Sequence, residues 1–258
     1  MPARDTDLDL LITAAQDSAA IAMRYFKRQI QIWDKGSDLG PVTEADLAVN
    51  QHLKAALTSA RPDYGWLSEE TPDDTERLGK DKVFILDPID GTRAFIAGED
   101  NFAVSLAIAE AGIVTHGVVI LPAKGRIYTA RRGEPAYCNG QAIRPSARHE
   151  LAHARILATK ANMAPAFWPK GVPDLQRSFR TSLAYRLCLV AEGRYDGMLT
   201  FRPTWEWDIA AGSLIVEAAG GVASDQSGQP LIFNRPEGKG PGVIAANAAL
   251  HAALLDRL

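Results

Sequence analysis

The sequence predicts an α/β protein whose first half is of the α+β type and whose second half alternates strands and helices. Three observations support this prediction. In the first part of the chain, apolar residues recur at helical spacing. Between residues 83 and 130, apolar runs typical of strands follow one another. After residue 143, short predicted strands alternate with predicted helices. We therefore expect two structural units, residues 1–143 and residues 144–258.

The first unit should open with two helices. Apolar residues recur at helical spacing over Asp7–Gln29, and a Gly- and Asp-containing loop follows over Trp33–Pro41. Thr43 is placed to cap the next helix, and Asp46 either belongs to that cap or points back towards a site. The short apolar strand over Gly65–Thr71 then ends in two adjacent acids, Glu69 and Glu70.

The strands that follow are joined by turn signals. Ala111-Gly112 separates the first two runs, which predicts a hairpin. The expected strands of this series are Val83–Leu86, Phe102–Ala109, Ile113–Leu121 and Arg126–Ala130.

The second unit has a different pattern, with a helix predicted at its centre that is closed by Gly193. The expected helices are Leu183–Ala191, Ile209–Ala219 and Ala248–Leu258, and the expected strands are Ile156–Thr159, Gly197–Phe201, Val222–Ser224, Leu231–Phe233 and Val243–Ala246.

The segment Asp87–Thr92 is the centre of the predicted site. Asp87 follows a buried strand, and Pro88 should end that strand in a turn. The turn would aim Asp87, the Ile89 carbonyl and Asp90 at one point, while Gly91 allows close approach and Thr92 begins a short helix suited to an anion. Such oxygen ligands are typical of a hard-cation phosphate site. An ordinary turn with Asp90 as a helix cap is the alternative.

Asp208 has two interpretations as well. It stands where a cap residue of the Ile209–Ala219 helix is expected, and capping alone explains an Asp there. A cap residue can also bind a metal, and the positive end of the helix would help to neutralise a phosphate beside it.

The stretch His149-Glu150-Leu151-Ala152-His153 matches the zinc-protease motif HExxH. A third ligand could come from Glu192–Asp196, but Pro145 and the strand at Ile156 leave room for little more than two helical turns. We expect these histidines to lie on an exposed helical turn between the two units.

Composition and net charge argue against some classes of binding partner and cellular compartment. The 258 residues are 47% apolar with a formal net charge of −3, which argues against a nucleic-acid polymer or a membrane as partner. Two distant cysteines and no signal-peptide-like apolar stretch lead us to expect a cytoplasmic protein. Phosphate-binding motifs of the GxxxxGK[ST] and GxGxxG types are absent, and Gly238–Gly242 is expected to be a flexible loop.

Taken together, the motifs resemble those of the inositol monophosphatase superfamily of magnesium-dependent, lithium-sensitive phosphatases. Four family patterns occur in the family order over most of the chain, namely Thr43–Asp46, Glu69-Glu70, Asp87–Thr92 and Trp207–Gly212. The resemblance implies a layered α/β/α/β/α sandwich with the site between its two halves.

The resemblance also implies roles for individual residues. Glu69, Asp87 and the Ile89 carbonyl would hold one Mg²⁺, and Asp87, Asp90 and Asp208 a second, with two or three ions in all. Water would be activated by Glu69 and Thr92, with Asp46 orienting Thr92. The substrate would be a small phosphorylated metabolite. The oligomeric state is left open, with a homodimer as one alternative. The residues expected to contact the substrate are Asp90, Gly91, Thr92, Arg186 and Asp208.

Within the superfamily, Cys188–Gly193 and Pro203–Asp208 look most like the bacterial 3'(2'),5'-bisphosphate nucleotidases, which hydrolyse 3'-phosphoadenosine 5'-phosphate to AMP. Arg186 replaces a Lys of that branch, preceded by Leu183 and Ala184. Phe201 stands where the inositol branch has an acid. Asp90–Phe95 is also similar to histidinol-phosphate phosphatases, so inositol 1-phosphate and histidinol phosphate are the alternative substrates. The alternative to an enzymatic function is that this chain is a regulatory, protein-binding member of the superfamily.

Overall fold

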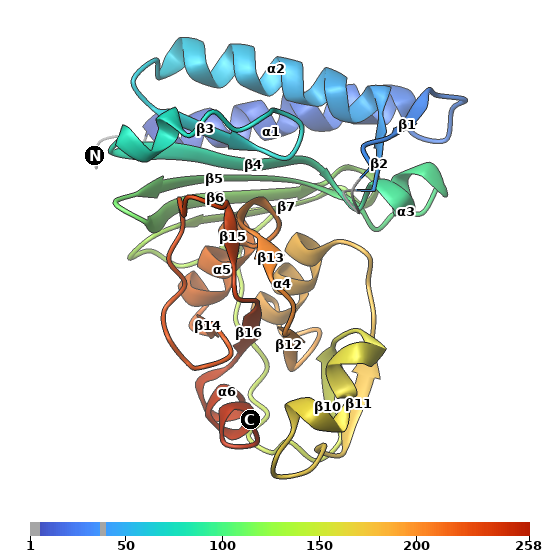
Figure 1. Ribbon diagram of the computed structural model, residues 1–258, viewed down its shortest axis with the longest axis vertical. Coiled ribbons are helices and arrows are strands. Elements are labelled where there is room, and N and C mark those ends of the chain that lie inside the picture. The colour runs from blue at the N-terminus through green and yellow to red at the C-terminus, as the bar shows by residue number, and fades with distance from the viewer. Residues whose placement is uncertain (1–5, 37–39) are drawn as a thin grey trace.

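The computed structural model describes residues 6–36 and 40–258 and has five layers (Figure 1). Helices α1 (Thr6–Tyr25) and α2 (Glu44–Ala60) cover one face of a seven-stranded sheet. Helices α4 (Leu183–Ala191) and α5 (Glu206–Ala218) lie between this sheet and a five-stranded sheet, with α6 (Ala248–Leu255) on the outer side. The predicted α/β/α/β/α sandwich is confirmed.

The seven-stranded sheet follows the chain order. Its first pair is parallel, and each later strand pairs antiparallel with the next. The strands are β3 (Gly65–Ser68), β4 (Lys82–Asp90), β5 (Ala103–Glu110), β6 (Ile113–Leu121), β7 (Arg126–Arg131), β8 (Tyr137–Cys138) and β9 (Gln141–Ala142).

Alternation along β4 explains why both faces of this sheet are covered. Phe84 and Leu86 pack against α1 and α2, whereas Val83 and Ile85 pack towards α4 and α5. An unbroken apolar run is therefore what a strand buried on both faces requires.

The five-stranded sheet has the order β11-β10-β12-β16-β14 and mixes parallel with antiparallel pairs. Its strands are β10 (Ala154–Leu157), β11 (Leu175–Ser178), β12 (Gly197–Thr200), β14 (Val222–Ser224) and β16 (Val243–Ala246). Two small ribbons complete the strands, β1 (Ile32–Asp34) with β2 (Pro41–Thr43) and β13 (Thr204–Trp205) with β15 (Lys239–Gly240).

The described residues also form a short helix, α3 (Thr92–Ile96). Their 3₁₀ helices are η1 (Glu76–Gly79), η2 (Pro122–Lys124), η3 (Lys160–Met163) and η4 (Pro165–Phe167).

Close packing of α4 on α5 depends on a missing side chain. A Cβ atom at Gly212 would lie 2.6 Å from Leu187 Cδ1, which real contacts do not allow. The glycine that ends the Trp207–Gly212 pattern is thus required where the two helices touch.

A buried arginine joins distant parts of the chain. Arg77 is 1% exposed, donates to both Asp73 carboxylate oxygens at 3.0 and 2.6 Å, and donates to Asn234 Oδ1 at 2.6 Å. The Glu206 carboxylate accepts hydrogen bonds from the amides of Asn234 and Arg235. This network fixes the 234–236 segment against η1.

Several local predictions were wrong. Gly238–Gly242, expected to be a flexible loop, contains β15. Pro88 does not end β4, since the strand continues to Asp90 with a register shift between Asp87 and Asp90. The predicted Trp33–Pro41 loop contains parts of β1 and β2, while residues 37–39 lie outside the described part of the chain. Leu231–Phe233 is not a strand; Pro230 forms only an isolated bridge to Ser224. His149–His153 contains no helical turn.

Over residues 6–36 and 40–258, no helix is both long and apolar enough to span a membrane.

Candidate active site

The end of β4 and the start of α3 form the centre of the site. Asp87 Oδ1 accepts a hydrogen bond from the amide of Ile89 at 2.9 Å, which folds the Asp87–Asp90 segment back on itself. Gly91 follows with φ +100°, and a Cβ atom there would lie 3.1 Å from the Asn101 carbonyl oxygen. The predicted glycine position is therefore a left-handed, closely approached turn that leads into α3.

Three carboxylates converge at this point from elements far apart in the sequence. Asp87, Asp90 and Asp208 each bring a carboxylate oxygen to within 4.8 Å of the other two. They line a cavity of about 580 Å³ together with Glu69, Gly91 and Thr92. Ile89 is fully buried, and its carbonyl oxygen accepts from Thr92 Oγ1 at 3.1 Å.

The predicted position of Asp208 as a helix cap is wrong. Helix α5 begins at Glu206, with Trp205 as its N-cap residue, so Asp208 lies inside the first turn. Its carboxylate accepts no hydrogen bond from residues 6–36 or 40–258, and it is therefore available to a ligand in the cavity.

The three carboxylates of the cluster repel one another, and a bound cation would neutralise them. Burial, followed by the charges of Glu69, Asp90 and Asp208, raises the pKa of Asp87 well above its usual range. Burial and the charges of Asp90 and Glu69 likewise raise the pKa of Asp208. Divalent cations are bound by carboxylate oxygens arranged in this way, so the residues present fit a hard metal ion.

Asp90 is held in place by the start of α4. Burial raises its pKa to about 6, although hydrogen bonds from Ser182 Oγ at 2.6 Å and the Ala184 amide at 2.7 Å favour its charged form. Ser182 also caps α4 by accepting from the Tyr185 amide. The sequence analysis missed Ser182, and no local signal relates it to Asp90, 92 residues earlier.

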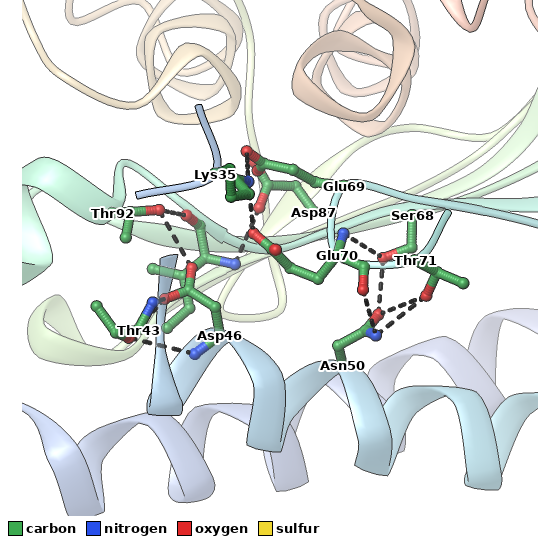
Figure 2. A network of polar contacts seen from close by, with 11 residues as sticks. Lys35, Thr43, Asp46, Asn50, Ser68, Glu69, Glu70, Thr71, Asp87 and Thr92 are labelled. Atoms are coloured by element: carbon green, nitrogen blue, oxygen red, sulfur yellow. Dashed lines mark hydrogen bonds and ion pairs between the residues drawn. The ribbon is translucent and has the colours of Figure 1, made fainter. Parts of the chain in front are cut away.

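Asp46 belongs to the helix cap and also points towards the candidate site, so both of its predicted positions occur together. Its Oδ2 accepts from the Thr43 amide at 2.9 Å and from Thr43 Oγ1 at 2.5 Å, which completes a capping box at the start of α2. Its Oδ1 accepts from Thr92 Oγ1 at 3.1 Å (Figure 2). Burial raises the pKa of Asp46 to about 6.

Glu69 lines the cavity but does not belong to the three-carboxylate cluster. Lys35 Nζ lies 2.8 Å from Glu69 Oε1 and 2.9 Å from Glu70 Oε1 (Figure 2). Burial, then the charge of Glu69, raises the pKa of Glu70 to about 7. The sequence analysis missed Lys35, because nothing in a Gly- and Asp-containing loop indicates an ion pair with acids more than thirty residues later.

Basic and aromatic side chains also line the cavity. Arg93, Arg186 and Arg202 line it, as does Phe179, which is 44% exposed. The Arg186 guanidinium carbon lies 4.4 Å from the Phe179 ring centroid, and its Nε and Nη2 donate to the carbonyl oxygens of Arg180 and Thr181. Burial lowers the pKa of Arg186 to about 10, so the side chain stays cationic at neutral pH. Only Arg186 of these four was predicted.

The HExxH stretch shows no metal-site geometry. His149 and His153 are both exposed and lie on irregular backbone, and His153 faces Asp174. Among residues 6–36 and 40–258, the sole group of three candidate metal ligands is the Asp87, Asp90 and Asp208 cluster.

Comparison with known proteins identifies the architecture around these acids. The model of the inositol monophosphatase family matches residues 4–258. The chain belongs to the inositol monophosphatase family. Members of this family are metal-dependent phosphoric monoester hydrolases, which agrees with the buried carboxylate cluster.

Individual relatives of this family member carry different names. A histidinol-phosphatase of Chlorobaculum parvum is 32% identical, covering 96% of this chain and 95% of the relative. An inositol-1-monophosphatase of Mesorhizobium japonicum is also 32% identical, covering 98% and 96%. The crystal structure of an extragenic suppressor protein suhB from Bartonella henselae matches with a TM-score of 0.84 and 27% identity, covering 98% of each chain. These relatives identify the family and not the substrate.

Proposed function

We propose that this chain is a Mg²⁺-dependent phosphomonoesterase that hydrolyses a small phosphorylated metabolite, 3'-phosphoadenosine 5'-phosphate being the favoured substrate. One observation carries the proposal: three carboxylates, of which Asp87 and Asp90 are buried and Asp208 half-buried, converge in a cavity that arginines also line. The groups that would hold two or three ions are Asp87, Asp90, Asp208, Glu69 and the Ile89 carbonyl.

Bound Mg²⁺ would neutralise phosphoryl oxygens and lower the pKa of a nearby water molecule. Glu69 takes the proton that the attacking water loses as its oxygen bonds to phosphorus and the ester P–O bond breaks. Thr92 has a single hydroxyl proton, which faces Asp46 Oδ1 and the Ile89 carbonyl. Its lone pairs are thus free to accept a hydrogen bond from that water. The leaving alcohol oxygen takes a proton from solvent water, and Glu69 returns its proton to solvent, which balances the reaction.

The arginines that line the cavity support a substrate with a second anionic group. The transferred phosphate lies at the carboxylate cluster, so Arg93, Arg202 and Nη1 of Arg186 remain available to another phosphate. Phe179 offers an exposed ring for stacking on a planar base. Phe201 is 5% exposed and packs on Phe167 and Trp168, so it offers no acid to a sugar hydroxyl.

Histidinol phosphate is the second candidate, since it has a planar ring that Phe179 can stack on, and a relative is named for it. Inositol 1-phosphate has neither a planar ring nor a second anionic group, and it ranks third.

The test is phosphate release from adenosine 3',5'-bisphosphate, histidinol phosphate and inositol 1-phosphate, with Mg²⁺ alone or with added Li⁺. Preference for the bisphosphate, suppression by Li⁺, and a higher KM for it alone in Arg186→Gln are the expected results. Preference for another substrate would overturn the nucleotide assignment and keep the metal site. Absence of release from all three would favour a protein-binding role.

Asp87→Asn and Asp208→Asn provide the second test. Each variant should remain folded and lose most of its turnover, because each loses a charged ligand. Near-normal turnover in either variant would contradict the proposed site.

A further inference from the structure

Helix α2 presents two polar side chains to the site, one turn apart. Asp46 and Asn50 are separated by four residues and therefore lie on the same face of the helix. Asp46 contacts Thr92, as described above. Asn50 contacts a different segment, the one that carries Glu69 and Glu70 (Figure 2).

Asn50 bonds the chain on both sides of the two acids. Its Nδ2 donates to the Glu70 carbonyl oxygen at 3.2 Å and to Thr71 Oγ1 at 3.1 Å. Its Oδ1 accepts from Ser68 Oγ at 2.7 Å. Thr71 Oγ1 in turn accepts from Trp66 Nε1 at 3.2 Å, so β3 and the residues beyond it are joined through one amide side chain.

The segment needs such a bond because regular strand pairing stops there. β3 ends at Ser68, and the last bond to β4 is from the Glu69 amide to the Leu86 carbonyl oxygen at 3.3 Å. Beyond it, the Glu70 and Thr71 amides donate, among the described residues, only to Ser68, to its Oγ and its carbonyl oxygen, each at 3.3 Å. Lys35 joins the two carboxylates, but the backbone that carries them is tied to the rest of the fold through Asn50.

We infer that Asn50 is a positioning residue for Glu69, so that a single turn of α2 orients both groups that act on the water, Thr92 through Asp46 and Glu69 through Asn50. This inference rests on the proposed function, since it takes Glu69 as a metal ligand. Removing a hydrogen-bonded partner of a metal ligand changes metal affinity by about 10- to 100-fold. Asn50 bonds the residues on either side of Glu69 and not its carboxylate, so the lower end of that range is expected.

The experiment is calorimetric titration of Mg²⁺ into the metal-free protein, which needs no substrate. Asn50→Ala removes both sets of bonds. Asn50→Leu keeps the branched shape of the side chain, can neither donate nor accept a hydrogen bond, and adds no charge near the site. We expect the Kd for Mg²⁺ to rise about 10-fold or more in both variants. The matched control is Gln51→Ala, the neighbouring exposed position of α2, which should leave the Kd unchanged.

A double-mutant cycle separates positioning from general loss of stability. If Asn50 acts through the 68–71 segment, Asn50→Ala should raise the Kd much less in a Ser68→Ala background than in the wild type. Equal effects in the two backgrounds, or a wild-type Kd in both Asn50 variants, would overturn the inference. A wild-type protein that does not bind Mg²⁺ would instead overturn the proposed function itself.

Discussion

Thr92 Oγ1 lies 3.1 Å from Asp46 Oδ1 and joins the first turn of α3 to the first turn of α2 across 46 residues of sequence. The same carboxylate closes the capping box on Thr43, so the helix cap and the site share one side chain. A residue that looks like an ordinary cap therefore also directs a hydroxyl towards the candidate metal site.

The Thr92 hydroxyl should matter for rate more than for stability. Thr92→Val keeps the shape of the side chain and removes the group that would accept from the attacking water. We expect kcat to fall by about 10²-fold, a typical contribution of a positioned polar group. Thr92→Ser, which retains the hydroxyl, should keep most of the activity. Steady-state rates at saturating Mg²⁺ measure both, and a Thr92→Val enzyme with wild-type kcat would exclude this role.

Lys35 should stabilise the metal-free protein in a pH-dependent manner. Lys35→Met removes the cation that neutralises Glu69 and Glu70, and breaking this partly buried pair should cost about 1–3 kcal/mol, between the values for exposed and buried pairs. The pKa of Glu70 is already raised to about 7 by burial and by Glu69, and it should rise further in the variant. A carboxyl with a raised folded pKa costs stability above its unfolded value, so the deficit should grow between pH 5 and pH 8.

Urea denaturation of metal-free protein at the two pH values measures this deficit. Lys27→Met is the matched control, because its ion pair with Asp100 is exposed and should contribute under about 1 kcal/mol. A deficit that is equal at pH 5 and pH 8 would show that Glu70 is not the group affected.

Arg77 should contribute to stability without contributing to catalysis. Arg77→Met leaves Asp73, Asn234 and two carbonyl oxygens without their donor, and we expect the free energy of unfolding to fall by about 3 kcal/mol. Turnover per folded molecule should not change. Arg131→Met, at an exposed pair with Glu134, should change the free energy by less than about 1 kcal/mol. An equal loss in the free energy of unfolding in the two variants would contradict the expectation that the buried Arg77 contributes more to stability than an exposed arginine.

His251 should make the fold sensitive to mild acid. The side chain is buried with Nε2 2.7 Å from Ser224 Oγ, and burial lowers its pKa. Because the folded pKa is below the unfolded value of about 6.5, its stabilising effect is complete above that pH and is lost as the pH falls below it. His251→Gln should flatten the stability profile between pH 7.5 and pH 5.5. A variant with an unchanged slope would show that other groups dominate.

Periodicity was sufficient to predict most helices and the central strands, since burial on one or both faces is recorded directly in residue spacing. It failed at Leu231–Phe233, where apolar residues pack into the core without pairing as a strand. The rule that a proline ends a strand failed at Pro88, because the register shift after Asp87 lets a proline lie within β4.

The acids of the candidate site lie in compact motifs, and the structure brings Asp87, Asp90 and Asp208 together. Lys35, Asn50 and Ser182 could not be found through such motifs. Each contacts the site through a partner that is distant in sequence, and each is a residue type common in loops, helix faces or caps. Their roles become visible only when the sheet and helices are assembled.

Asp208 reaches the cluster from α5, whereas Asp87 and Asp90 belong to the first sheet. A ligand that engages all three carboxylates can thus bind only when α5 has docked on that sheet. By mass action, such a ligand shifts the folding equilibrium towards the native state by about 2.7 kcal/mol at 100 times its Kd. The free concentration of the ion would then determine how much of the chain is folded, and the midpoint of thermal unfolding would report it.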